Sequence, residues 1–118
     1  MDKINLDEKF DLFSEHWSPK IVADLNGQQV KIAKLLGEFE WHHHDNEDEL
    51  FWVVKGNLLV HFRDRTETLG PGEILVIPKG VEHKPEAPEE VQLVMFEPAS
   101  TVNTGETDSD RMVVPERI

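Results

Sequence analysis

Residues 37–56 of the chain read GEFEWHHHDNEDELFWVVKG, with three histidines in a row near the centre. His42 and His44 lie two residues apart, so both side chains point to the same face of an extended backbone, and His43 points away. Glu49 follows five residues after His44. Imidazole and carboxylate groups gathered in this way are common ligands of first-row transition metals. This stretch therefore predicts that His42, His44 and Glu49 are ligands of a metal site.

The residues between these ligands predict how they meet. Residues 45–48, Asp-Asn-Glu-Asp, favour a turn that would reverse the chain and bring Glu49 back beside the histidines in a hairpin. A fourth candidate ligand, His83, follows a buried apolar segment and the turn at 78–80. Three imidazole nitrogens and one carboxylate oxygen suit Fe, Mn, Co, Ni or Zn. An ion with an octahedral preference would keep two positions open for water, oxygen or substrate, as reactive sites do.

Glycines and a proline flank the candidate ligands in two patterns, and both patterns resemble motifs of the cupin family. The first motif has a glycine, a His-x-His pair, a glutamate and a second glycine; its counterparts here are Gly37, His42, His44, Glu49 and Gly56. The second motif has a glycine, a proline, a glycine and a histidine; its counterparts here are Gly72, Pro78, Gly80 and His83. The two motifs span residues 37–87, and both in order make a specific signal.

The chain departs from the cupin pattern in two places, neither of them a ligand position. The spacing from Gly37 to His42 is one residue shorter than usual, and Ala87 stands where the second motif often ends in asparagine. The resemblance implies a double-stranded β-helix (jelly-roll) barrel. It also implies a divalent transition metal, a small-molecule substrate or ligand, and a homodimer. The chain is most similar to the small single-domain cupins.

The pattern of strands and turns also favours an all-β fold. Short segments rich in β-branched and aliphatic residues alternate with turn residues, and no long helical stretch separates them. The expected strands are Gln29–Leu36, Leu50–Val54, Leu58–Phe62, Ile74–Ile77 and Val91–Phe96. Turn residues between them include Pro85–Glu90. We expect one domain over residues 1–118, with a barrel core at about 20–97.

The two ends of the chain are expected to lie outside this barrel core. Apolar residues at helical spacing predict a short helix over 5–13, with Asn5 as its N-cap, covering one end of the barrel. Residues 98–118 predict a polar surface loop followed by an edge strand at Arg111–Val114. Pro115 suits the end of such a strand, because proline cannot donate a backbone hydrogen bond.

The composition limits the classes of partner. Lys and Arg number 12 and Asp and Glu number 24, which gives a formal net charge of −12 at pH 7. Such an acidic chain repels nucleic acid and anionic lipid, so neither is an expected partner. The absence of cysteine excludes thiol chemistry and fits a reducing compartment. No apolar run approaches the roughly 20 residues of a membrane helix, and the acidic start does not resemble a secretory signal, so a cytoplasmic location is expected.

Glu40 is the candidate catalytic residue. It shares the parity of His42, so its carboxylate could act as a base or orient a ligand histidine. The simpler alternative is a carboxylate at the barrel mouth, paired with Lys or Arg. His61 and hydroxide on the metal are the other candidate bases, and the chain has no tyrosine to serve instead. Without Glu49 and His83, the three histidines would indicate only a solvated polar turn.

The principal functional hypothesis is a metalloenzyme with dioxygenase- or isomerase-type chemistry on a small organic substrate. One alternative is a non-catalytic cupin that binds or senses a small molecule. Another is a phosphosugar isomerase-like activity, which would need a basic pocket built from Lys79, Lys84, Arg63 and Arg65. A purely structural metal site agrees less well with two open coordination positions.

Overall fold

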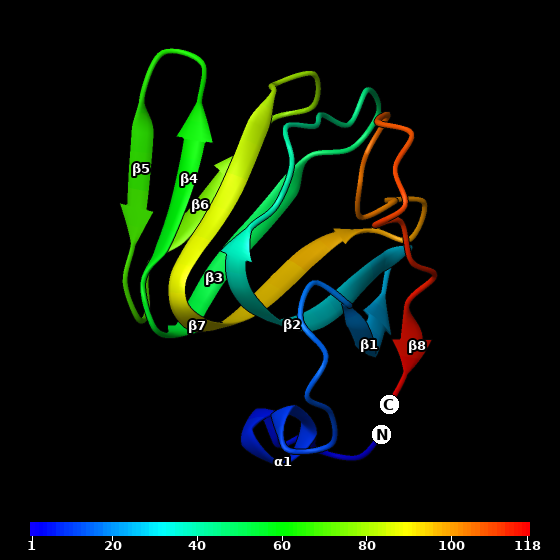
Figure 1. Cartoon of the computed structure of the whole chain (residues 1–118). Coiled ribbons are helices and arrows are strands. Elements are labelled where there is room, and N and C mark those ends of the chain that lie inside the picture. Colours follow the sequence, from blue (N-terminus) through cyan, green and yellow to red (C-terminus); the bar gives the residue numbers. More distant parts are fainter.

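The computed structural model describes residues 1–118 and contains one short helix and eight strands (Figure 1). The elements in chain order are α1 (Leu6–Phe10), β1 (Lys20–Leu25), β2 (Gln28–Glu38), β3 (Glu49–Lys55), β4 (Leu58–Phe62), β5 (Thr66–Leu69), β6 (Ile74–Ile77), β7 (His83–Pro98) and β8 (Glu116–Arg117). Each of the five strands expected in the barrel core falls within one of these elements. The structure adds β1, β5 and β8.

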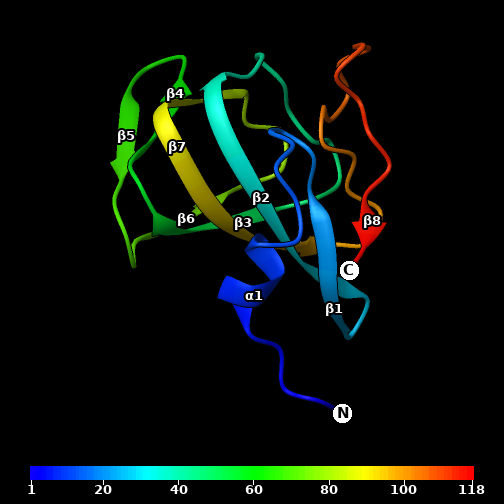
Figure 2. The same ribbon diagram turned by 60° about the horizontal axis from the view of Figure 1, so that its bottom comes forward.

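The long strand β7 organises the sheet. β2 runs antiparallel to β7 along most of its 16 residues (Figure 2). On its other side, β7 pairs first with β4 and then, beyond the middle of the strand, with β3. Because the partner of β7 changes midway, the strands form two layers that share β2 and β7, and the sheet closes into a barrel. The expected all-β jelly-roll fold is confirmed.

The barrel interior is filled by side chains of one parity on each strand. On β2, for example, Ala33 and Leu35 point inward, whereas the outward-facing Ile32 belongs to a separate, smaller apolar cluster. The interior cluster consists of twelve buried residues: Ala33, Leu35, Phe51, Val53, Leu58, Val60, Leu69, Ile77, Ala87, Val91, Leu93 and Met95. This core fixes which face of each strand is turned toward the barrel axis.

The predicted helix over 5–13 is shorter than expected. Its N-cap is Asn5 as predicted, because the side-chain oxygen of Asn5 accepts from the backbone N–H of Glu8 at 3.0 Å. The helix ends at Phe10, however, and the carbonyl oxygen of Phe13 accepts instead from Lys34 Nζ at 2.7 Å. A contact with the neighbouring strand therefore replaces the last expected turn of this marginal helix.

The helix also lies in a different place from the one predicted. Phe10 is fully buried against Ile32 of β2 and Val94 of β7, which face away from the barrel interior. α1 thus covers the outer face of the sheet rather than an open end of the barrel (Figure 2).

Three local expectations were wrong. Residues Pro85–Glu90 do not form a turn but continue β7. The strand does not require a backbone N–H from Pro85 at this position, and the carbonyl oxygen of Pro85 accepts from the N–H of Phe39 at 2.9 Å. β2 and β3 do not form a hairpin; each pairs with β7 instead. The last strand is not Arg111–Val114 but β8, which pairs in parallel with β1. The N–H of Val113 donates to Asn103 Oδ1 at 3.0 Å and is therefore not available for pairing with a strand.

No helix of the structure is long and apolar enough to cross a membrane.

Two motif glycines differ in what surrounds them. Gly56 has φ +88°, and a Cβ atom there would lie 2.6 Å from the carbonyl oxygen of Glu90 on β7. Gly37 has a similar φ of +83°, but a Cβ atom there would have no neighbour within 4 Å. Both positions favour glycine for their backbone conformation, and only Gly56 is also required by a close approach between strands.

We expect Gly56→Ala to lower the free energy of unfolding by about 3 kcal/mol or more, because left-handed strain and a steric clash add together. Gly37→Ala should cost only about 1 kcal/mol, from the strain alone. Urea denaturation of both variants measures the difference. Equal losses would contradict the close approach at Gly56.

Candidate metal centre

The four candidate ligands come from three parts of the chain that meet at one end of the barrel. His42 and His44 lie in the segment after β2, Glu49 is the first residue of β3, and His83 is the first residue of β7. His42 and His83 form an isolated antiparallel bridge, with N–O distances of 3.0 Å and 2.9 Å between their backbones. This pairing sets two imidazoles side by side, with ring centroids 4.3 Å apart.

The donor atoms of these side chains converge on one point. The two carboxylate oxygens of Glu49 lie 3.4 Å from His44 Nε2 and 3.4 Å from His83 Nε2. One donor atom from each of the four residues lies within 4.8 Å of the other three. All four side chains are buried. The structure therefore brings together the four residues that the sequence analysis named as ligands.

Backbone carbonyl groups orient two of the imidazoles. His42 Nδ1 lies 2.9 Å from the carbonyl oxygen of Glu40, and His83 Nδ1 lies 2.9 Å from that of Val81. A carbonyl oxygen can only accept, so each Nδ1 carries the proton and each Nε2 is left with a free lone pair. This arrangement is typical of metal-binding histidines, whose second nitrogen is held by an outer hydrogen bond.

Several of the converging atoms have no partner within the protein. Both ring nitrogens of His44, Nε2 of His83 and Oε1 of Glu49 are buried without a hydrogen bond. Buried polar atoms are normally hydrogen-bonded, and leaving them unpaired is costly. A divalent cation would satisfy one nitrogen of His44, Nε2 of His83 and Oε1 of Glu49 together, so the donor set fits a transition metal.

Electrostatics keep two of the four donors, His42 and Glu49, in the form that binds metal, whereas the pKa of His44, despite burial, is raised by the adjacent Glu49. Burial, together with the neighbouring His83, lowers the pKa of His42 to about 4, so its imidazole is neutral at pH 7. Burial opposes ionisation of Glu49, but the adjacent rings of His44 and His83, each with Nε2 at 3.4 Å from a carboxylate oxygen, outweigh it and hold the pKa of Glu49 well below its ordinary value. A neutral imidazole and an ionised carboxylate are the forms that bind metal.

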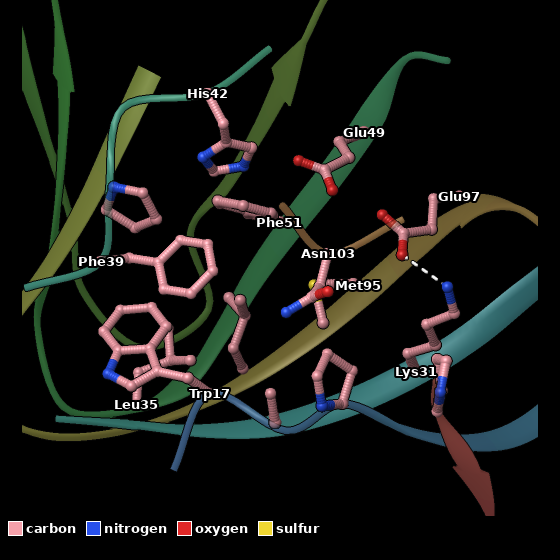
Figure 3. A pocket seen from close by; sticks show the side chains of 15 residues that line it. Trp17, Lys31, Leu35, Phe39, His42, Glu49, Phe51, Met95, Glu97 and Asn103 are labelled. Atoms are coloured by element: carbon pink, nitrogen blue, oxygen red, sulfur yellow. Dashed lines mark hydrogen bonds and ion pairs between the residues drawn. The ribbon is translucent and has the colours of Figure 1, made fainter. Parts of the chain in front are cut away.

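A cavity adjoins the cluster and has a mostly apolar wall (Figure 3). It encloses about 530 Å³, part of which is open to solvent, and His42 and Glu49 line it. Trp17 and Phe39 stack across one side, with ring centroids 4.9 Å apart. A mostly apolar wall with a few polar groups at its ends is typical of sites that bind small organic molecules.

Opposite the aromatic stack, the cavity wall carries an ion pair that the sequence analysis missed. Lys31 Nζ lies 2.8 Å from Glu97 Oε1, and the two side chains are 2% and 4% exposed. Burial and the nearby Glu49 charge raise the pKa of Glu97 well above its ordinary value, while Lys31 lowers it in part. The only signal in the sequence was that Lys31 lies two residues before Ala33 and so shares the face of β2 that carries the core residues.

The other polar residues named from the sequence lie outside the cavity. The carboxylate of Glu40 accepts a hydrogen bond from the hydroxyl of Ser109, and Glu40 does not line the cavity. His43 is partly exposed and lies 3.1 Å from Asp45. His61 is held between Thr66 and Glu86 on the outside of the barrel. The structure thus does not bring Glu40 or His61 together with the candidate ligands.

The C-terminal loop braces the segment that carries His42 and His44. The N–H of Glu106 donates to the carbonyl oxygen of His43 at 2.9 Å, and Thr107 Oγ1 donates to that of Trp41 at 3.2 Å. Gly105, with φ +58°, lies directly against this segment, and a Cβ atom there would overlap the carbonyl oxygen of His43. The loop therefore supports ligands that no regular strand holds.

A family model of the cupin domain matches residues 29–97, a range that contains all four candidate ligands. The chain belongs to the cupin family. The resemblance carried by the two glycine-flanked motifs is thereby confirmed. Family membership is consistent with the observed jelly-roll fold, and cupins bind small-molecule ligands.

Among curated relatives, the uncharacterized protein YdbB of Bacillus subtilis is 42% identical over 64 residues, which are 53% of this chain and 57% of that protein. An acireductone dioxygenase of Bacillus licheniformis is 28% identical over 67 residues, 52% of this chain and 37% of that protein. The cupin thus spans 57% or less of the length of either curated relative. The crystal structure of a cupin-2 domain containing protein from Shewanella frigidimarina is 52% identical, covers 80% of this chain and 93% of its own, and has a TM-score of 0.80.

A double variant tests the metal centre. We expect His42→Ala/His83→Ala to weaken metal binding by more than about 100-fold. Loss of a single outer-shell partner can already cost about 100-fold, and this variant removes two of the ligands themselves. The fold should remain, since the apolar barrel core does not include these residues. Metal titration and circular dichroism measure the two effects. The control His43→Ala should bind metal like the unaltered protein, and an equal loss there would contradict the assignment.

A second variant tests the brace. Gly105→Ala should displace the loop from the ligand segment and weaken metal binding by about tenfold, as outer-shell changes do. The control is Gly27→Ala, because Gly27 also has a positive φ, of +78°, but no atom near its added Cβ. Metal titration of both variants should separate them. Unchanged affinity in Gly105→Ala would show that the loop does not support the ligands.

Proposed function

We propose that this cupin is a metal-dependent enzyme that acts on a small organic substrate with oxygenase- or isomerase-type chemistry. Its metal would be held by His42, His44, Glu49 and His83. The observation that carries the proposal is the convergence of four buried donors, several without partners, beside a mostly apolar cavity. A closed structural site would have no need of the adjoining cavity.

A divalent transition metal bound there would supply Lewis acidity toward a substrate oxygen, or electrons for an oxidation. The chain's own residues prepare the cavity for that chemistry. The carbonyl groups of Glu40 and Val81 keep the Nε2 atoms of His42 and His83 unprotonated and directed inward. Trp17 and Phe39 form an apolar wall that excludes water from one side of the substrate.

Similarity to known proteins supports the oxygenase type more than any other single activity. One curated relative is named an acireductone dioxygenase, although this chain spans only 37% of it at 28% identity. The ligand set of three histidines and one glutamate is also suited to iron, nickel, manganese and cobalt, which serve in such reactions. Because the similarity covers a small part of that relative and the ligand set suits several metals, the identity of the metal and that of the substrate belong to the proposal.

The two alternatives from the sequence differ in their support. A phosphosugar isomerase-like activity would need the predicted basic pocket, but none of its four residues, Lys79, Lys84, Arg63 and Arg65, lines the cavity. We therefore do not extend the proposal to it. The other alternative is a protein that binds a small molecule without turnover, and a search for product distinguishes it from an enzyme. The homodimer and the cytoplasmic location stay predictions.

The test begins with the metal content of the protein purified without added metal, measured by elemental analysis. We expect near one ion per chain, and then oxygen uptake or product formation with enolisable diketones, catechols or sugars. The variant His42→Ala/His83→Ala should lose both the metal and the turnover. Thermal stabilisation by these compounds without any product would favour the binding module, and protein that takes up no metal would overturn the proposal.

A further inference from the structure

The buried ion pair on the cavity wall is not explained by the metal centre. Lys31 lies on β2 and Glu97 on β7, and both line the cavity together with the ligand Glu49 (Figure 3). Lys31 is the only lysine or arginine in this wall. A buried ion pair contributes little net stability, because desolvation offsets the attraction between the charges. Its position on a cavity rather than in the closed core therefore points to a binding role.

The hydrogen bonding of Lys31 leaves room for a ligand. An ammonium group carries three donors, and Glu97 Oε1 at 2.8 Å is the single acceptor that the structure gives to Lys31 Nζ. Two donors of a side chain that is 2% exposed thus have no acceptor in the protein. Buried donors of a charged group are costly to leave unpaired. A ligand oxygen in the cavity would satisfy them.

The charges of the cavity select the sign of that ligand. Ionised Glu97 would cancel the charge of Lys31, and a divalent ion would exceed the charge of Glu49 by one, which would leave one positive charge in a largely apolar enclosure. Charges in such surroundings interact more strongly than in water. A monoanion would neutralise the cavity, while a neutral molecule would leave the charge uncompensated and a cation would add to it.

We infer that Lys31, positioned by Glu97, binds the carboxylate of a small substrate whose other polar end reaches the metal. This inference rests on the proposed function and names its substrate class, a small organic acid with an apolar middle. Trp17, Phe39 and Met95 provide the apolar surface between the two polar ends of the cavity. Lys31 thereby determines specificity and takes no part in the reaction itself.

The test uses two probes that differ at one end. 3-(Imidazol-1-yl)propanoic acid can bind a metal through its neutral ring nitrogen and carries a free carboxylate, and its primary amide replaces that carboxylate by a neutral group. Isothermal titration calorimetry on the metal-loaded protein gives Kd for each probe. We expect the acid to bind at least about tenfold more tightly than the amide, the gain of one charged hydrogen bond.

The decisive variant is Lys31→Met/Glu97→Gln, which removes the ammonium donor but leaves the net charge of the cavity unchanged. Its preference for the acid should fall several-fold, to what the unchanged net charge alone sustains. The control Lys55→Met removes one positive charge from an exposed position outside the cavity and should keep the full preference. The single variant Glu97→Gln keeps Lys31 and should also keep it.

The outcomes separate this inference from the proposed function. Elemental analysis and circular dichroism first establish that every variant is folded and holds its metal. A double variant that binds metal and still prefers the acid by tenfold would overturn the role of Lys31 and leave the metalloenzyme intact. Loss of the preference in Lys55→Met as well would mean that overall charge, not Lys31, selects the acid. Unaltered protein that takes up no metal would overturn both proposals.

Discussion

The backbone pairing of His42 with His83 is the contact on which the metal centre depends. The two N–H groups and the two carbonyl oxygens of this bridge bond each other at 3.0 Å and 2.9 Å, which fixes both Cα atoms. Neither residue can move without breaking both bonds. β7 begins at His83, and β3, whose first residue is Glu49, pairs with β7 from Leu50 onward and with Ile77 of β6 at Glu49 itself. The site is thus an extension of the barrel's hydrogen-bond network.

The site also concentrates unfavourable interactions that a cation would relieve. Four atoms of His44, Glu49 and His83 are buried without hydrogen bonds, in a chain that otherwise pairs nearly all of its buried side-chain polar atoms. Such a concentration at one point is difficult to reconcile with a structural role alone. The apolar core beside it compensates, since twelve buried residues stabilise the barrel without any contribution from the ligands.

The sequence predicted those parts of the protein that local patterns determine. Strand parity distinguished His42 and His44 from His43, and the two motifs indicated His83 and the jelly-roll fold. Parity failed for Glu40, because the backbone after β2 is irregular and the alternation of an extended strand does not hold there. The hairpin between β2 and β3 was wrong for a related reason: the partner of both strands is β7, and pairing between distant strands leaves no local signal. The Lys31–Glu97 pair joins residues 66 positions apart and was missed on the same ground.

The Lys31–Glu97 pair also shows why net charge is a poor guide to the ligand of this protein. The chain carries a formal charge of −12, yet most of its acidic residues are exposed to solvent, where salt screens them within about 8 Å. A molecule inside the cavity is surrounded instead by low-dielectric walls and by the few charges that face it. There the balance depends on Lys31, Glu97, Glu49 and the metal that the ligands would hold. An acidic exterior is therefore compatible with a cavity that selects an anion, and the nearest charges decide the preference.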